Sequence, residues 1–376
     1  MENINQSIVF LIDFIGIIQG IVLGTLLLFI NRKQQSTIFL GCFILAYSLE
    51  MIPGVITNLG LEKEYPMLAF LPVNFFLLQF PLFYVYIQKV SIFSRANKIN
   101  YTVLYPGLLY FVLQLVVFLL PSSFREVIIN SLWYASIDVL GLIFSIWVGI
   151  KTVRWINHHI KEVGKQYSNI AFKELRWARV FVLFGIAYII FSFFLYGIWN
   201  TQIIDVVFSI VNVGLLYWVS LRGIMQLNIN SVQVERGAEI ENVIDNEEKE
   251  HVKNNNANDE NEDLRKVADK IGNYIKMKSL YTNPELSIGD LSNELKLHSK
   301  YISKVINTVH QQNFNTYINT FRINKAKELL ADVNYSKYSL EGIGEEVGYL
   351  NKSTFYRVFK KMTGLTPNEF KKEQAQ

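Results

Sequence analysis

Long apolar segments fill the first 222 residues of this 376-residue chain and constrain its fold more than any other feature. Each is near the ~20 residues that a helix needs to cross a bilayer. Seven such segments cover residues 8–30, 36–58, 67–88, 101–120, 128–150, 179–199 and 202–221. The whole chain is 51% hydrophobic with a mean hydropathy of +0.22, which is more apolar than an ordinary soluble protein. The sequence therefore predicts a seven-helix transmembrane bundle over residues 1–222.

Lysine and arginine are divided unevenly between the two sides of this predicted bundle. The loops after the first, third and fifth segments carry two, three and seven of them, whereas the facing loops carry only Lys63 and Arg125. Cytoplasmic loops of membrane proteins are enriched in Lys and Arg. The pattern predicts an outside N-terminus, and seven crossings then place the C-terminus in the cytoplasm.

Near the C-terminus, residues 339–367 are typical of two short helices joined by a tight turn. Ser339 is a plausible N-cap, and Gly348 permits the positive φ angle that a sharp turn between helices needs. Asn351 can cap the second helix, which Gly364 stops. Apolar residues recur at helical spacing on one face of this second helix, and basic and hydroxyl residues cover the other. Such a helix is suited to a DNA groove.

The same arrangement occurs once before in the chain. Its first helix is offset by 52 residues (Ser287 to Ser339) and its second helix by 53 (Ser299 to Lys352), so one turn is a residue longer. A single amphipathic helix pair would mean little, because helices that pack in a core look alike. Two copies in matching register, both basic outside, indicate two helix-turn-helix units at about 287–309 and 339–362.

Residues 265–373 resemble the DNA-binding domain of AraC/XylS-type bacterial regulators, which carry two helix-turn-helix units joined by a long helix. The closing signature of that family is matched by Val347-Gly-Tyr, Ser353-Thr-Phe, Arg357-Val-Phe-Lys-Lys and Gly364-Leu-Thr-Pro, and the joining helix by residues 314–330. The first unit is a looser match, because Lys296 stands where a turn glycine is frequent. The resemblance covers 109 of the 376 residues and implies double-stranded DNA as a partner.

The outer faces of the two second helices, together with the resemblance, indicate which side chains meet DNA. Ser299, Lys300, Ser303 and Lys304 are expected in one groove, and Lys352, Ser353, Thr354, Tyr356 and Arg357 in the other. Lys360 and Lys361 are expected at phosphates.

An acidic stretch separates the two parts of the chain. Residues 223–263 hold 3 basic and 11 acidic residues (net −8), whereas residues 264–376 hold 18 and 11 (net +7). The stretch is rich in Glu, Asn and Asp and has too few apolar residues to offset chain entropy. We expect three parts: a membrane domain (1–222), an acidic disordered linker (223–263) and a DNA-binding domain (264–376). The fold class is therefore all-α, a seven-helix transmembrane bundle plus a cytosolic bipartite helix-turn-helix domain.

Four acidic residues lie in or at the edge of the apolar segments: Asp13, Glu50, Asp138 and Asp205. Acids in a membrane are costly and suggest function by default. One interpretation is that Asp13 and Asp205 reach interfacial water and that Glu50 is protonated or hydrogen-bonded. The other is a shared, outward-facing pocket for a cationic or polar ligand. A two-aspartate membrane protease is a poor match, because neither Asp138 nor Asp205 has Gly-rich surroundings.

The expected function is a membrane-embedded one-component transcriptional regulator that senses a signal in its membrane domain. Neither a phosphate loop, a nucleophile elbow nor zinc-ligand spacing occurs in the sequence, so we expect no enzyme activity, no cofactor and no metal. The expected location is the bacterial inner membrane, multi-pass, with the DNA-binding domain in the cytoplasm. The lipid bilayer is the second partner; a small ligand and a homodimer stay open. Two alternatives remain: a transporter-like or enzymatic membrane domain whose DNA-binding tail reports its state, and a membrane domain that only tethers.

Overall fold

The computed structural model describes residues 2–30, 35–94, 98–170, 173–198, 202–244, 257–335 and 337–374. Regular structure in these residues is helical, apart from one isolated bridge between Tyr167 and Ser287, which confirms the all-α prediction. The chain divides into two compact units. Unit 1 comprises residues 1–159 and 175–233, and unit 2 comprises residues 160–174 and 234–376.

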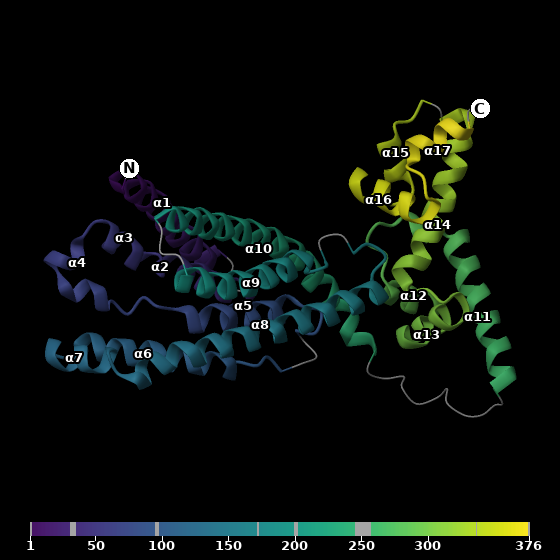
Figure 1. Ribbon diagram of the computed structural model, residues 1–376. Coiled ribbons are helices and arrows are strands. Elements are labelled where there is room, and N and C mark those ends of the chain that lie inside the picture. The colour runs from purple at the N-terminus through teal and green to yellow at the C-terminus, as the bar shows by residue number, and fades with distance from the viewer. Residues whose placement is uncertain are drawn as a thin grey trace. The chain divides into compact units, whose positions relative to one another are not determined.

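Unit 1 is built from the long apolar helices and several short connecting ones (Figure 1). Its elements are α1 (Glu2–Ile30), α2 (Gln35–Leu49), α3 (Ile52–Asn58), α4 (Leu61–Glu64), η1 (Pro66–Phe70), α5 (Phe76–Val90), η2 (Thr102–Leu104), α6 (Tyr105–Leu119), α7 (Ser122–Ile129), α8 (Leu132–Gln166), α9 (Arg176–Ile198) and α10 (Gln202–Ile244). The last residues of α8 and of α10 belong to unit 2.

Helix α2 lies at the centre of the packing in unit 1, against both α1 and α5. Where α1 and α2 cross, Gly24 meets Gly41: a Cβ added to Gly41 would lie 2.8 Å from the Gly24 carbonyl oxygen. Small residues at crossing points let helices approach closely, which is a common device in membranes, where lipid is as apolar as the side chains.

In the part of the chain that the structure describes, five helical segments are long and apolar enough to cross a membrane. They are Ser7–Phe29, Ser36–Asn58, Thr102–Leu119, Leu132–Gln166 and Asp205–Gln226. The predicted third segment, 67–88, is not one continuous helix. It begins in η1 and passes through residues 71–75 before α5, which has only 15 residues, because Pro72 has no N–H to donate to a helix that would continue from η1. The predicted sixth segment corresponds to α9, and its last residue, Trp199, lies outside the described residues.

Unit 2 contains the helices of the predicted DNA-binding domain (Figure 1). Its elements are α11 (Ala257–Met277), η3 (Leu280–Thr282), α12 (Ile288–Leu295), α13 (Ser299–His310), α14 (Phe314–Ala331), η4 (Val333–Tyr335), α15 (Leu340–Glu346), α16 (Lys352–Thr363) and α17 (Pro367–Gln374).

Helix α14 joins two separate hydrophobic cores. Its first half contributes Phe314 and Ile318 to a core shared with α11, α12 and α13. Its second half contributes Ile323 and Leu330 to a core shared with α15 and α16. Both cores consist entirely of residues between 264 and 370, so the predicted 264–376 domain has its own buried interior.

The acidic stretch is more helical than its composition predicts. Helix α10 continues to Ile244 and α11 begins at Ala257, so helix covers residues 223–244 and 257–263. Many of these residues, such as Gln, Glu, Arg and Ala, are good helix formers and extend a helix that is already nucleated. Residues 245–256 lie outside the described residues, and the linker boundaries stay a prediction.

Candidate DNA-binding surface and membrane-domain cavity

The first helix-turn-helix unit consists of α12 and α13. Ser287 accepts a hydrogen bond from the Asp290 N–H, and the Asp290 carboxylate accepts one from the Ser287 N–H at 2.7 Å, which completes a capping box. Lys296 ends α12 with φ 52°, in the left-handed region that glycine favours. His298 then caps α13 by accepting from the Lys300 N–H, a role that the sequence analysis did not predict.

The second unit, α15 and α16, has the predicted caps. Ser339 accepts from the Gly342 N–H and Asn351 from the Thr354 N–H. Gly348 makes the turn with φ 94°, and Gly364 ends α16 with φ 85°. The helices of the two units start 52 and 53 residues apart, at Ile288 and Leu340 and at Ser299 and Lys352, so the predicted register is confirmed.

The outer faces of α13 and α16 carry the side chains that the sequence analysis assigned to DNA. In the first unit Lys300 and Lys304 are exposed, and Ser299 and Ser303 are half-buried. In the second unit Thr354 and Tyr356 are half-buried, and the others are exposed: Lys352, Ser353, Arg357, Lys360 and Lys361. Lys352 is already engaged, because it pairs with Glu341 at 2.6 Å, and this contact raises the pKa of the lysine.

A polar seam along α14 links the two helix-turn-helix units. Arg322, only 1% exposed, donates from Nε to the Tyr281 carbonyl at 2.6 Å and from Nη2 to the Asn283 carbonyl at 2.7 Å. Burial lowers the pKa of Arg322 to about 10, still well above neutral pH, so the guanidinium is charged. Tyr349, next to the turn of the second unit, donates to Asn319 on α14 at 2.8 Å.

Arg322 was not predicted to be buried. The spacing of the residues around it could have indicated burial, because Ile318, Arg322 and Ala326 recur every four residues on one face of α14 and all three are buried.

Unit 1 encloses a cavity of about 670 Å³. Three of the four predicted acids line it: Asp13, Glu50 and Asp205. The fourth, Asp138, is exposed on α8 and is not among the lining residues. The structure thus brings together residues from α1, from the end of α2 and from α10.

Hydrogen bonds hold several polar groups of this cavity in place. Gln79 donates to Glu50, Ser209 hydrogen-bonds Asp13, and the Tyr47 hydroxyl donates to Asn212 at 3.0 Å. Ser145 is 2% exposed, and its hydroxyl has no hydrogen-bond partner among the described residues. Lys, Arg and His are absent from the described lining, so the three carboxyl groups are its only ionisable acids or bases apart from tyrosine. In the described part of the chain, no group of three or more His, Cys, Asp or Glu is placed to hold a metal ion.

Two capped helix pairs joined by one long helix, each with a basic outer face, define a bipartite helix-turn-helix domain. Residues 291–373 match a family described as "Helix-turn-helix domain". The C-terminal part of the chain is therefore an AraC-type helix-turn-helix domain, as the resemblance implied.

Curated relatives match over the same part of the chain. The melibiose operon regulatory protein of Escherichia coli (strain K12) is 31% identical over 91 residues, which are 24% of this chain and 29% of that protein. The uncharacterized transcriptional regulatory protein YesN of Bacillus subtilis is 31% identical over 117 residues, 30% of this chain and 28% of that protein. YtdP, an uncharacterized HTH-type transcriptional regulator of B. subtilis, is 27% identical over 90 residues, 24% of this chain and 11% of that protein. This chain thus spans less than a third of the length of these relatives.

Proposed function

We propose that this protein is a membrane-embedded transcription regulator that reads DNA with two helix-turn-helix units and is controlled by a signal received in its membrane helices. The observation that carries the proposal is the pair of capped units in matching register, each with a basic outer face over its own core. The similarity to bacterial transcriptional regulators supports the DNA-binding half. The long apolar helices and the cavity in unit 1 support the sensing half.

In this proposal α13 and α16 enter successive major grooves about 34 Å apart on one face of the duplex. Ser299, Lys300, Ser303 and Lys304 face one groove, and Lys352, Ser353, Thr354, Tyr356 and Arg357 face the other. Lys360 and Lys361, in the last turn of α16, neutralise phosphates.

Removing two positive charges from α16, one at a time, should have different consequences. Lys360→Ala should weaken binding to all sequences and reduce the slope of log affinity against log salt by about 0.9, because one phosphate contact is lost. Arg357→Ala should lower the binding free energy for the preferred site by ~1–3 kcal/mol and relax the preference for one base there. Fluorescence anisotropy with operator and scrambled duplexes over a salt series measures both.

The control is Lys325→Ala, which removes a half-buried lysine that pairs with Glu328 on α14 and does not belong to α13 or α16. It should leave the salt slope unchanged. If Lys360→Ala and Arg357→Ala also bind like the parent, α16 does not read DNA as proposed.

The proposed topology has seven crossings with the N-terminus outside, so that unit 2 lies in the cytoplasm. The distribution of Lys and Arg supports this orientation. The short α5 would be the third crossing; 12 of its 15 residues are buried, which suits a helix surrounded by protein within a bundle.

Reporter fusions test this topology. A reporter that works only in the cytoplasm should be active when it is joined after residue 222 and inactive when it is joined near Lys63. Periplasmic alkaline phosphatase fused at the same points supplies the inverse control. Reversed activities would put the DNA-binding domain on the wrong side of the membrane and would refute the proposal.

The cavity of unit 1 is the proposed ligand site of the sensing half. Its three carboxylates, its aromatic walls and the unpartnered Ser145 hydroxyl favour a ligand with a positive charge or several N–H and O–H donors. The proposed ligand contacts are Asp13, Glu50 and Asp205. Asp138, which the cavity does not include, has no part in this site.

A further inference from the structure

Residues 160–170 and 173–174 follow the apolar part of α8, yet they belong to unit 2 together with the DNA-binding domain. We call these residues the docking segment. Its backbone pairs with the loop before α12: the Ser168 N–H donates to the Leu286 carbonyl at 3.0 Å, and Tyr167 forms an antiparallel bridge with Ser287.

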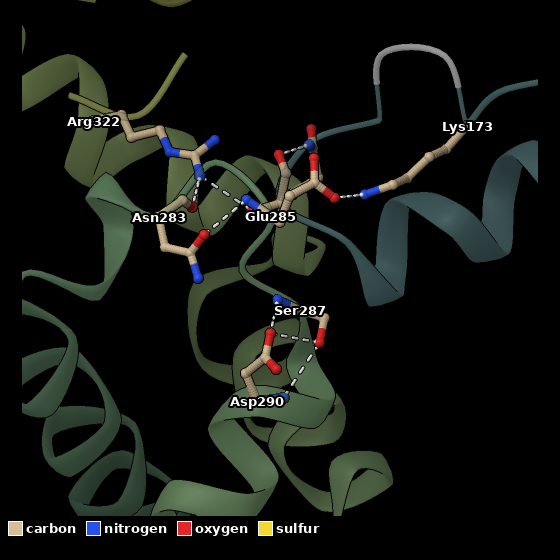
Figure 2. A network of polar contacts seen from close by, with 8 residues as sticks. Lys173, Asn283, Glu285, Ser287, Asp290 and Arg322 are labelled. Carbon is tan, nitrogen blue, oxygen red and sulfur yellow. Dashed lines mark hydrogen bonds and ion pairs between the residues drawn. The ribbon is translucent and has the colours of Figure 1, made fainter. Parts of the chain in front are cut away.

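Side chains reinforce this backbone pairing. Ser168, 1% exposed, accepts from the Arg322 guanidinium at 3.1 Å, and its carbonyl accepts from the Asn315 amide. Figure 2 shows Lys173 reaching from its segment toward Glu285, and the two form an ion pair of 2.8 Å. The Lys173 side chain is only 5% exposed. A lysine is rarely buried unless it is paired, so this pair is specific.

The partner surface on the DNA-binding domain is small and polar. It consists of Glu285, Leu286 and Ser287 at the start of the first unit and of Asn315 and Arg322 on α14. The same Arg322 also donates to Asn283 and Tyr281, so the docking segment adds a further hydrogen bond to the seam described above.

We propose that the docking segment binds the first helix-turn-helix unit and that this binding competes with DNA. The segment pairs with Leu286 and with Ser287, the N-cap residue directly before α12. In a helix-turn-helix the first helix crosses the DNA backbone, and helix N-termini donate hydrogen bonds to phosphates. The docked segment occupies that end of α12. Because it is continuous with α8 and α9, movement of those helices would change its position; this step rests on the proposed sensing function.

The docking itself can be measured without DNA. Hydrogen exchange of the full chain in lipid nanodiscs should show a protected Ser168 amide. Lys173→Glu and Glu285→Lys each place two like charges together and should speed exchange at Ser168 by at least ~10-fold, equivalent to about 1.4 kcal/mol. The double variant Lys173→Glu/Glu285→Lys should restore protection. Equal exchange at Ser168 in the parent and both single variants would overturn the docking.

The matched control is Lys165→Glu. Lys165 makes its ion pair inside the segment, with Glu162 at 2.6 Å, so this variant changes the charge of the segment by the same amount without touching the docking surface. It should leave Ser168 protected.

Competition with DNA is measured on the same samples with a random-sequence duplex at low salt. By electrostatics alone, Lys173→Glu and Lys165→Glu should both weaken binding, because each replaces a positive charge with a negative one. Release of the docking segment should instead strengthen DNA binding, because it frees the start of α12. Lys173→Glu should therefore bind at least ~5-fold more tightly than Lys165→Glu, a typical size for coupling between two sites.

Two further outcomes separate this inference from the proposed function. If Lys173→Glu releases the segment but binds DNA no more tightly than Lys165→Glu, the competition is refuted and the docking stands. If the parent and all variants fail to bind any duplex, the proposed DNA-binding function is refuted, while the exchange rates at Ser168 still decide the docking.

Discussion

Replacing Gly348 with alanine is expected to destabilise the DNA-binding domain by several kcal/mol and to abolish DNA binding through the second unit. Gly348 has φ 94°, a backbone conformation that costs an L-residue about 1–3 kcal/mol. An added Cβ would also lie 2.7 Å from the Tyr281 carbonyl oxygen and 2.8 Å from that of Thr282. Both of these atoms belong to the backbone, so they cannot relieve the clash by changing rotamer. Such overpacking lowers the free energy of unfolding by about 1–3 kcal/mol more.

A second glycine in the same domain separates these two causes. Gly364 has φ 85°, but nothing lies within 4 Å of an added Cβ, so Gly364→Ala should show only the backbone strain. Gly342, inside α15, meets only the Ser339 hydroxyl at 3.4 Å, and alanine there should stabilise the helix by about 0.5–1 kcal/mol. Urea unfolding of a fragment covering residues 257–376, followed by circular dichroism, measures all three. If Gly348→Ala is as stable as Gly364→Ala, the turn of the second helix-turn-helix unit can move away from the backbone of Tyr281 and Thr282 without loss of stability.

Arg322→Met should also lower the stability of the DNA-binding domain by several kcal/mol, because it removes buried hydrogen bonds. The guanidinium supplies donors to two carbonyl groups, those of Tyr281 and Asn283, and methionine supplies none. A buried polar group that loses its partner costs about 1–3 kcal/mol, so two together cost about 2–6 kcal/mol. Since these bonds tie the residues that lead into the first helix-turn-helix unit to α14, the affinity for DNA should fall together with stability.

Arg322→Lys is the informative companion variant. Lysine keeps the charge, but its single ammonium lacks the planar fork that reaches both carbonyls, so it should recover only part of the loss. Arg265→Met, at an exposed position of α11, should change stability by no more than ~0.5 kcal/mol. If Arg322→Met unfolds at the same urea concentration as Arg265→Met, the polar seam along α14 does not stabilise the DNA-binding domain.

The candidate DNA-binding surface was largely predictable because its determinants are local. A capping serine or asparagine, a glycine in a turn and an apolar face with a period of 3.6 each act within a few residues. Ser287, Ser339, Asn351 and Gly364 therefore have the predicted conformations. His298 escaped prediction because histidine is an uncommon cap; it holds the N-cap position of α13, two residues after Lys296 turns the chain with a positive φ angle.

The apolar part, residues 1–222, was predictable in composition but less so in geometry. Hydropathy located the apolar segments, and within the described residues five of them form helices long and apolar enough to cross a membrane. Hydropathy does not register how prolines divide a segment, so the stretch 67–88 was predicted as one helix. It also gives no distances between segments. The grouping of Asp13, Glu50 and Asp205 around one cavity, and the position of Asp138 apart from them, depend on how the helices pack.

By itself, the sequence determined the all-helical class, the two helix-turn-helix units, their caps and the basic character of their outer faces. These properties follow from the periodicity and backbone preferences of neighbouring residues. Only the tertiary structure decided that Arg322 is buried between the two units, that Gly348 touches the backbone of Tyr281, and that the docking segment lies against Ser287. These contacts join residues that are 39 to 154 positions apart, as in the bonds of Arg322 to Asn283 and to Ser168. Such contacts arise because a charged or polar group removed from water must find a partner wherever the folded chain supplies one, and no local pattern encodes where that is.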